Sequence, residues 1–161
     1  MSKPSVYVDL DGSLSPSDLL LESCLRLIRA NFLMLFRIVW WALQGPWRLK
    51  CEVFGRVAPD WELLPIRPEV LTLLENYRKD GHRLVLASAS MLPHVQDVAR
   101  HVGVFDHVLG STDSNLKGRE KLQAIVRDCG GEPFVYVGDS KADLPVWAGA
   151  AQAVVVAPGA G

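Results

Sequence analysis

This chain of 161 residues has little net charge, no closely spaced cysteines and no zinc-ligand pattern. Each of these absences excludes a class of protein. The formal net charge is only −1 at pH 7, so no overall field favours nucleic acid. The three cysteines, Cys24, Cys51 and Cys129, are widely spaced and form no CxxC pattern, which indicates reduced thiols in a cytosolic protein. No histidine has the spacing of a zinc ligand, so a structural zinc site is not expected. The first residues show no signal-peptide pattern.

The chain does contain enough apolar sequence for one compact domain, with 49% hydrophobic and 22% charged residues. Short apolar runs alternate with helical patterns along most of its length. The runs predict strands at Val6–Leu10, Arg83–Ser88, Phe105–Leu109, Phe134–Val137 and Ala153–Val156, and the patterns predict helices at Glu69–Asp80, Pro93–His101, Gly118–Cys129 and Ala142–Ala148. Such alternation indicates an α/β fold with a parallel sheet that is flanked by helices on both faces.

Residues 14–66 fall outside this alternation. Their pattern is helical over Pro16–Gln44, with Ser15 or Ser17 as the expected N-cap, and a second helix is expected over Pro46–Val57. Six basic and two acidic residues lie between positions 19 and 58. Four of the five tryptophans also fall in this segment: Trp40, Trp41, Trp47 and Trp61. The segment is therefore predicted to be a helical insertion with a basic, aromatic character.

The apolar run Phe32–Leu43 contains a single charged residue, Arg37. It is too short to span a membrane, which takes about 20 apolar residues. Two interpretations remain open. The helix packs on the rest of the protein, or it faces an anionic membrane surface or a lipid phosphate, because Trp and Arg are typical of interfacial helices.

Two aspartates, Asp9 and Asp11, end the first predicted strand and are followed by Gly12. Residues two apart in a strand point to the same side, so their carboxylates are expected side by side. Such a pair repels and favours a divalent cation, with an acid or nucleophile role for the carboxyl groups. Asp-Gly is also a common turn, and a calcium loop of the EF-hand kind lacks its further acidic positions here.

Further reactive side chains follow the other predicted strands. Ser88 ends the second strand, Asp139 and Asp143 follow the fourth, and Lys117 precedes a helix. Ligands of open parallel sheets bind outside the carboxyl ends of the strands, so these groups are expected to meet Asp9 at one edge. Each has an ordinary alternative: Ser88 as a turn residue with Ser90 as a rival, Lys117 as a surface lysine like Lys121 and Arg119, and Asp143 as a helix-start residue.

Four short motifs resemble those of the haloacid dehalogenase (HAD) superfamily: DLDGS at 9–13, LAS at 86–88, NLKG at 115–118 and GDSKAD at 138–143. They occur in the family's order and cover nearly the whole chain. The runs LASAS, NLKG and YVGDSKADLPVWAGA are more narrowly similar to the HAD-type domain fused in front of UbiA-type prenyltransferases in bacteria. The resemblance implies a Rossmann-like core of residues 1–13 and 67–161, with residues 14–66 as a small helical C1 cap that selects the substrate.

The resemblance also implies roles for single residues. Asp9 matches the nucleophile that becomes phosphorylated, and Asp11 matches the general acid and base. Mg²⁺ would be held by Asp9, Asp139 and the backbone carbonyl of Asp11. The phosphoryl oxygens would be bound by Ser88, by the backbone N–H of Ala89 and by Lys117, while Asp143 would lie behind them and orient Lys117 or a metal-bound water.

The implied function is that of a Mg²⁺-dependent phosphatase acting on a phosphosugar or a polyprenyl-linked phosphate. A phosphotransferase or mutase would use the same motifs, and a non-catalytic docking or regulatory module of a membrane prenyltransferase is the alternative from another class. The expected location is the cytoplasm, with the inner face of the membrane as a further expectation through the cap.

Overall fold

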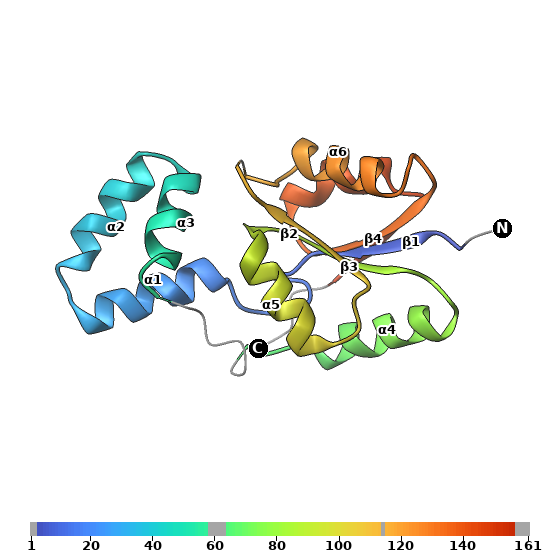
Figure 1. Cartoon of the computed structure of the whole chain (residues 1–161), viewed down its shortest axis with the longest axis horizontal. Coiled ribbons are helices and arrows are strands. Elements are labelled where there is room, and N and C mark those ends of the chain that lie inside the picture. Colours follow the sequence, from blue (N-terminus) through green and yellow to red (C-terminus); the bar gives the residue numbers. More distant parts are fainter. Residues whose placement is uncertain (1–2, 58–63, 114, 157–161) are drawn as a thin grey trace.

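A computed structural model describes residues 3–57, 64–113 and 115–156 (Figure 1). The predicted insertion residue Trp61 lies outside the described residues. Five parallel strands form one sheet in the order β3-β2-β1-β4-β5. They are β1 (Ser5–Val8), β2 (Leu84–Met91), β3 (His107–Ser111), β4 (Phe134–Gly138) and β5 (Gln152–Val155). The predicted α/β fold class is therefore confirmed.

Helices cover both faces of the sheet because the strands are apolar on both sides. Val6 and Val8 on β1 pack against α4 (Pro68–Lys79) and α5 (Leu92–Val102). Tyr7, between them, faces α6 (Arg119–Asp128) and α7 (Leu144–Gly149) on the other side. Figure 1 shows α4 and α5 on one side of the sheet and α6 on the other. This two-sided burial fixes β1 at the centre and its carboxyl end at the middle of one edge.

The insertion forms a separate group of three helices beyond the carboxyl edge of the sheet (Figure 1): α1 (Leu19–Ala30), α2 (Met34–Leu43) and α3 (Pro46–Phe54). They have their own small core of Cys24, Leu27, Trp41 and Val53. Leu20 and Leu64 connect the insertion to the main core, since Leu64 belongs to that core and Leu20 packs against both clusters.

The single helix expected from residue 16 to 44 is wrong in two details. The chain breaks between α1 and α2, where Asn31 takes an extended conformation and its side chain accepts a hydrogen bond from the Leu33 N–H. The N-cap of α1 is Asp18 rather than Ser15 or Ser17, because its carboxylate accepts the N–H groups of Leu20 and Leu21. No helix among the described residues is long and apolar enough to span a membrane.

Candidate active site

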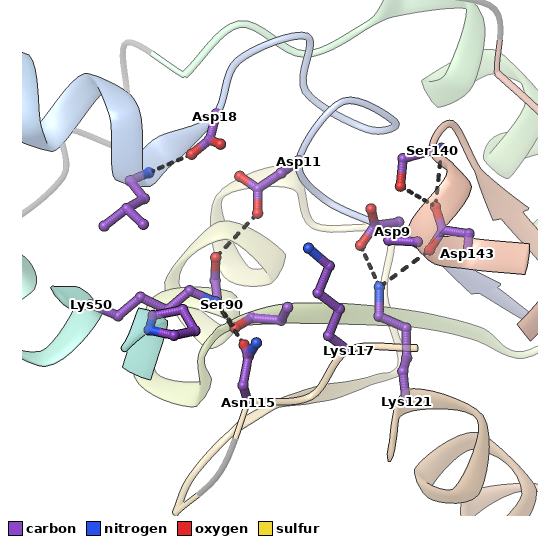
Figure 2. A pocket seen from close by; sticks show the side chains of 14 residues that line it. Asp9, Asp11, Asp18, Lys50, Ser90, Asn115, Lys117, Lys121, Ser140 and Asp143 are labelled. Carbon is purple, nitrogen blue, oxygen red and sulfur yellow. Dashed lines mark hydrogen bonds and ion pairs between the residues drawn. The ribbon is translucent and has the colours of Figure 1, made fainter. Parts of the chain in front are cut away.

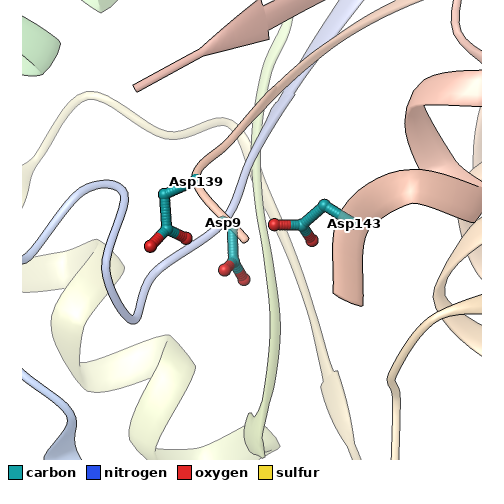
Figure 3. A group of neighbouring side chains, drawn as sticks. All are labelled: Asp9, Asp139 and Asp143. Carbon is teal, nitrogen blue, oxygen red and sulfur yellow. The ribbon is translucent and has the colours of Figure 1, made fainter. Parts of the chain in front are cut away.

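Three carboxylates meet at the carboxyl ends of the two central strands (Figure 3). Asp9 directly follows β1, Asp139 directly follows β4, and Asp143 ends the short 3₁₀ helix η2 (Lys141–Asp143). One oxygen from each carboxylate lies within 4.8 Å of the other two. Since β1 and β4 pair in parallel register from Ser5 to Val8, the convergence of Asp9 and Asp139 follows directly from the sheet.

A buried ammonium group contacts this cluster. The Nζ of Lys121 donates to Asp9 Oδ1 at 2.7 Å and to the Tyr136 hydroxyl at 3.1 Å, and it lies 3.7 Å from Asp143 Oδ1. Lys121 is only 3% exposed. The earlier comparison of Lys121 with ordinary surface lysines is therefore wrong. Lys121 stands four positions before the buried Ile125 on α6, so helical periodicity could have placed it on the buried face.

Three carboxylates and one ammonium group leave excess negative charge in a largely buried site. Burial raises the pKa of Asp9 to about 6, with Asp143 and Asp11 adding to the rise and Lys121 opposing it. Burial likewise raises the pKa of Asp139, and the charge of Asp143 contributes. The excess charge and the oxygen donors suit a hard divalent cation.

Asp143 already has hydrogen-bond partners for both oxygens. Its Oδ1 accepts the Tyr136 hydroxyl at 2.7 Å, and its Oδ2 accepts the Ser140 N–H and hydroxyl at 3.3 Å each. Asp139 accepts one hydrogen bond from the Ser13 hydroxyl at 3.1 Å. Asp139 therefore has more oxygen lone pairs available to a cation than Asp143 has.

Asp11 lies on the other side of Asp9 and joins the sheet to the insertion (Figure 2). Its Oδ1 accepts the Leu19 N–H at the start of α1, and its Oδ2 accepts the Ser90 hydroxyl, each at 3.2 Å. Burial raises the pKa of Asp11, although both hydrogen bonds oppose the rise. A carboxyl group with a raised pKa is suited to donate a proton.

Glycine is required directly after Asp11, where the backbone passes close to Asp139. Gly12 has a φ of +85°, and a Cβ there would lie 2.1 Å from Asp139 Oδ2. A side chain at position 12 would displace Asp139 from the cluster, so the backbone can approach this carboxylate only at a glycine.

The two serines after the second strand have different positions. Ser88 is fully buried and its hydroxyl accepts the Ser90 N–H at 3.0 Å. Ser90, the rival, lines the pocket together with Ala89, and it donates to Asp11. The structure thus brings Ala89 and Ser90 to the pocket surface, with Ser88 behind them.

A pocket of about 330 Å³ lies between the sheet edge and the insertion. Lys117, predicted to neutralise charge beside Asp9, lines this pocket and extends toward it in Figure 2. Among the described residues, however, the cation in contact with Asp9 is Lys121. Lys50 on α3 also lines the pocket and was not predicted as a site residue; its partner Asn115 belongs to the NLKG motif but was given no role.

One curated relative is similar to nearly the whole chain. A curated relative, the uncharacterized protein y4nM of Sinorhizobium fredii, is 37% identical over 159 residues, which is 98% of this chain and 30% of that protein. The chain thus spans less than a third of its relative's length.

Solved structures share the fold. A protein of unknown function from Bordetella pertussis Tohama I has a TM-score of 0.76 at 12% identity, covering 96% of this chain and 90% of that one. A probable phosphoserine phosphatase from Vibrio cholerae has a TM-score of 0.65 at 16% identity, covering 95% of this chain and 56% of that one. The family model of haloacid dehalogenase-like hydrolases matches residues 7–147. The chain belongs to the haloacid dehalogenase-like hydrolase family.

Proposed function

We propose that the chain is a phosphomonoester hydrolase that works through a phosphoaspartyl intermediate on Asp9. The observation that carries the proposal is the setting of this one carboxylate. Asp9 lies at the carboxyl end of the central strand, has Lys121 at 2.7 Å, and faces a pocket that Asp11 also lines. Family membership and the resemblance of the fold to a probable phosphoserine phosphatase support it.

The reaction would proceed in two displacements. A carboxylate oxygen of Asp9 attacks phosphorus and forms the aspartyl–phosphate bond, while the bond to the leaving oxygen breaks and that oxygen takes the proton of Asp11. Asp11, now a carboxylate, then removes a proton from water as the water oxygen attacks phosphorus. The aspartyl–phosphate bond breaks, inorganic phosphate leaves, and both aspartates return to their starting forms.

The residues present fit a Mg²⁺ ion. Asp9, Asp139 and the backbone carbonyl of Asp11 would hold it, and the ion would neutralise charge on the phosphoryl group. Asp143 lies within reach of the same point, but Tyr136 and Ser140 occupy its oxygens. We therefore assign Asp143 the positioning of Lys121, from which it is 3.7 Å away.

The two lysines would have different roles in phosphoryl transfer. Lys121 holds the attacking carboxylate and screens it from the incoming anion. Lys117, which also lines the pocket, would bind phosphoryl oxygens together with the Ala89 N–H, while Ser90 and Ser88 support this loop. A phosphotransferase or mutase would use the same residues and differ only in the attacking hydroxyl.

A phosphatase assay with p-nitrophenyl phosphate and Mg²⁺ tests the proposal. Asp9→Asn should lower turnover by at least about a thousandfold, because the amide is not a nucleophile. The matched control is Asp80→Asn, at the exposed end of α4, which should retain full activity. Turnover by Asp9→Asn at the control's rate would refute the assignment of Asp9 as the nucleophile. No turnover by the unaltered protein with any phosphomonoester would instead favour the docking module.

We also propose that the insertion contacts an anionic membrane surface. One side of α2 packs on α1 and α3 through Trp41, but the other side exposes large apolar residues. These residues, with their neighbours on α1 and the turn after it, are Leu21, Leu25, Phe32, Leu33, Phe36, Val39, Trp40 and Leu43. The basic residues Arg26, Arg29 and Arg37 are exposed beside them, and this combination suits an interfacial helix pair.

Co-sedimentation with vesicles tests this surface. Binding should require anionic lipid, should weaken with salt, and should fall at least about fivefold in a Trp40→Ser, Phe36→Ser double variant. Equal binding to neutral vesicles, or none at low salt, would overturn it. The fusion to a prenyltransferase and the cytoplasmic location remain predictions.

A further inference from the structure

The insertion places one charged side chain deep into the pocket. Lys50 on α3 reaches across to the core, where its Nζ donates to the Ala89 carbonyl at 2.5 Å and to Asn115 Oδ1 at 2.9 Å. Figure 2 shows Lys50 entering the pocket from the insertion, on the side away from Asp9 and Lys121. A residue of the insertion thus forms part of the pocket wall that faces the reacting carboxylate.

The charge of Lys50 has no carboxylate partner at ion-pair distance among the described residues. Both hydrogen-bond acceptors are neutral oxygens. Burial lowers the pKa of Lys50, and the charges of Lys117 and Lys121 lower it further, while Asp11 and Asp18 oppose this. A half-buried ammonium with only neutral acceptors is costly unless an anion completes the site.

The phosphoryl group does not account for this charge. Lys121 already contacts Asp9, and Lys117 lies between Lys50 and the Asp9 cluster in Figure 2. The pocket of about 330 Å³ is larger than a phosphoryl group, so the remainder of the substrate has room between Asp9 and Lys50. The wall near Lys50 also carries Asp18, Leu20 and Pro46 from the insertion.

We propose that Lys50 is a substrate-binding residue, and that the preferred substrate is a small phosphomonoester whose non-transferred part carries a second anionic group. That group, a carboxylate or a second phosphate, would replace the Ala89 carbonyl and Asn115 as the hydrogen-bond acceptor of Lys50. The inference rests on the proposed phosphatase function and names its substrate class.

Binding and turnover of three matched ligands test it: propyl phosphate, 3-phosphooxypropionate and propane-1,3-diyl bisphosphate. Calorimetry on the Asp9→Asn protein measures binding without transfer. The two ligands with a second anion should bind at least about tenfold more tightly than propyl phosphate. Lys50→Gln should remove most of that preference, and Lys50→Arg should retain part of it.

The control is Arg48→Gln on the same helix, whose guanidinium pairs with Glu52 outside the pocket; it should leave the preference unchanged. Equal affinity for the three ligands, or an equal loss for all three in Lys50→Gln, would overturn the inference. The carboxylate and bisphosphate arms identify which anion is preferred. Turnover by the unaltered protein is measured separately, so a protein that binds with the expected preference but hydrolyses nothing would refute the phosphatase and not this role of Lys50.

Discussion

Helix α6 carries a buried charged side chain near each end, and the two charges are neutralised to different degrees. Lys121 in the first turn and Asp128 in the last turn both oppose the helix dipole. Each is also largely buried, since their side chains are 4% and 13% exposed. Both therefore depend on partners from the sheet.

Asp128 has more donors than it needs. It accepts the Tyr7 hydroxyl at 2.6 Å and two Arg83 nitrogens at 2.7 and 3.3 Å, with His107 at 3.5 Å. Although burial opposes it, these hydrogen bonds lower the pKa of Asp128. Lys121, by contrast, is a single positive charge beside several carboxylates, and the pKa values of Asp9 and Asp139 are raised. A satisfied cluster stabilises the fold, and an unsatisfied one indicates a binding site.

Of the changes to the two ends of α6, removal of the Lys121 ammonium group is expected to have the largest effect. Lys121→Met should lower phosphatase turnover at least about a hundredfold, because Asp9 then meets an anionic substrate without its counter-charge. Lys117→Met should act mainly through a higher KM. Steady-state kinetics on both variants, with circular dichroism to verify folding, measures this. Equal kcat losses in the two variants would contradict this division of roles between the two lysines.

The second effect concerns stability of the metal-free protein. The pKa of Asp9 is raised from 3.8 to about 6, so between these values the folded state binds more protons than the unfolded state. Stability should therefore increase as pH falls from 7 toward 4.5, by about 1–3 kcal/mol. Urea unfolding in the presence of a chelator measures this, and Asp9→Asn should flatten the dependence. At pH 7, Mg²⁺ should stabilise the protein by neutralising the same carboxylates that protonation neutralises at lower pH. A loss of stability over that range would contradict the charge imbalance.

The parallel sheet and the position of Asp9, Asp11 and Asp139 at its carboxyl edge follow from the alternating apolar pattern, so they could be predicted from the sequence. The choice between lysines could not be made from motif spacing alone. Lys117 and Lys121 lie in one short stretch, and the face that α6 turns to the sheet decides which one is buried.

The insertion shows the same limit more clearly. Its helices follow from periodicity and from Gly45-Pro46, but the break near Asn31 depends on a local side-chain hydrogen bond. The reach of Lys50 to Ala89 and Asn115 depends on how the insertion packs on the core. These partners are 39 and 65 positions away, and no local pattern in the sequence connects them.

The smallest effect distinguishes the two ends of α6 by sign. Asp128→Asn should destabilise the protein by about 1–2 kcal/mol at pH 7, because it removes charge-assisted hydrogen bonds from Tyr7 and Arg83. The pKa of Asp128 is lowered from 3.8, so its contribution is complete above that pH and disappears as pH falls through the folded-state value. Acidification should therefore shrink the difference between variant and unaltered protein, opposite to the gain expected from Asp9. Urea unfolding at pH 7, 5 and 3 measures both, with Asp80→Asn as the exposed control. A difference that stays constant down to the lowest pH would show that the Asp128 charge contributes nothing, and the contrast between the two ends of α6 would then rest on Lys121 alone.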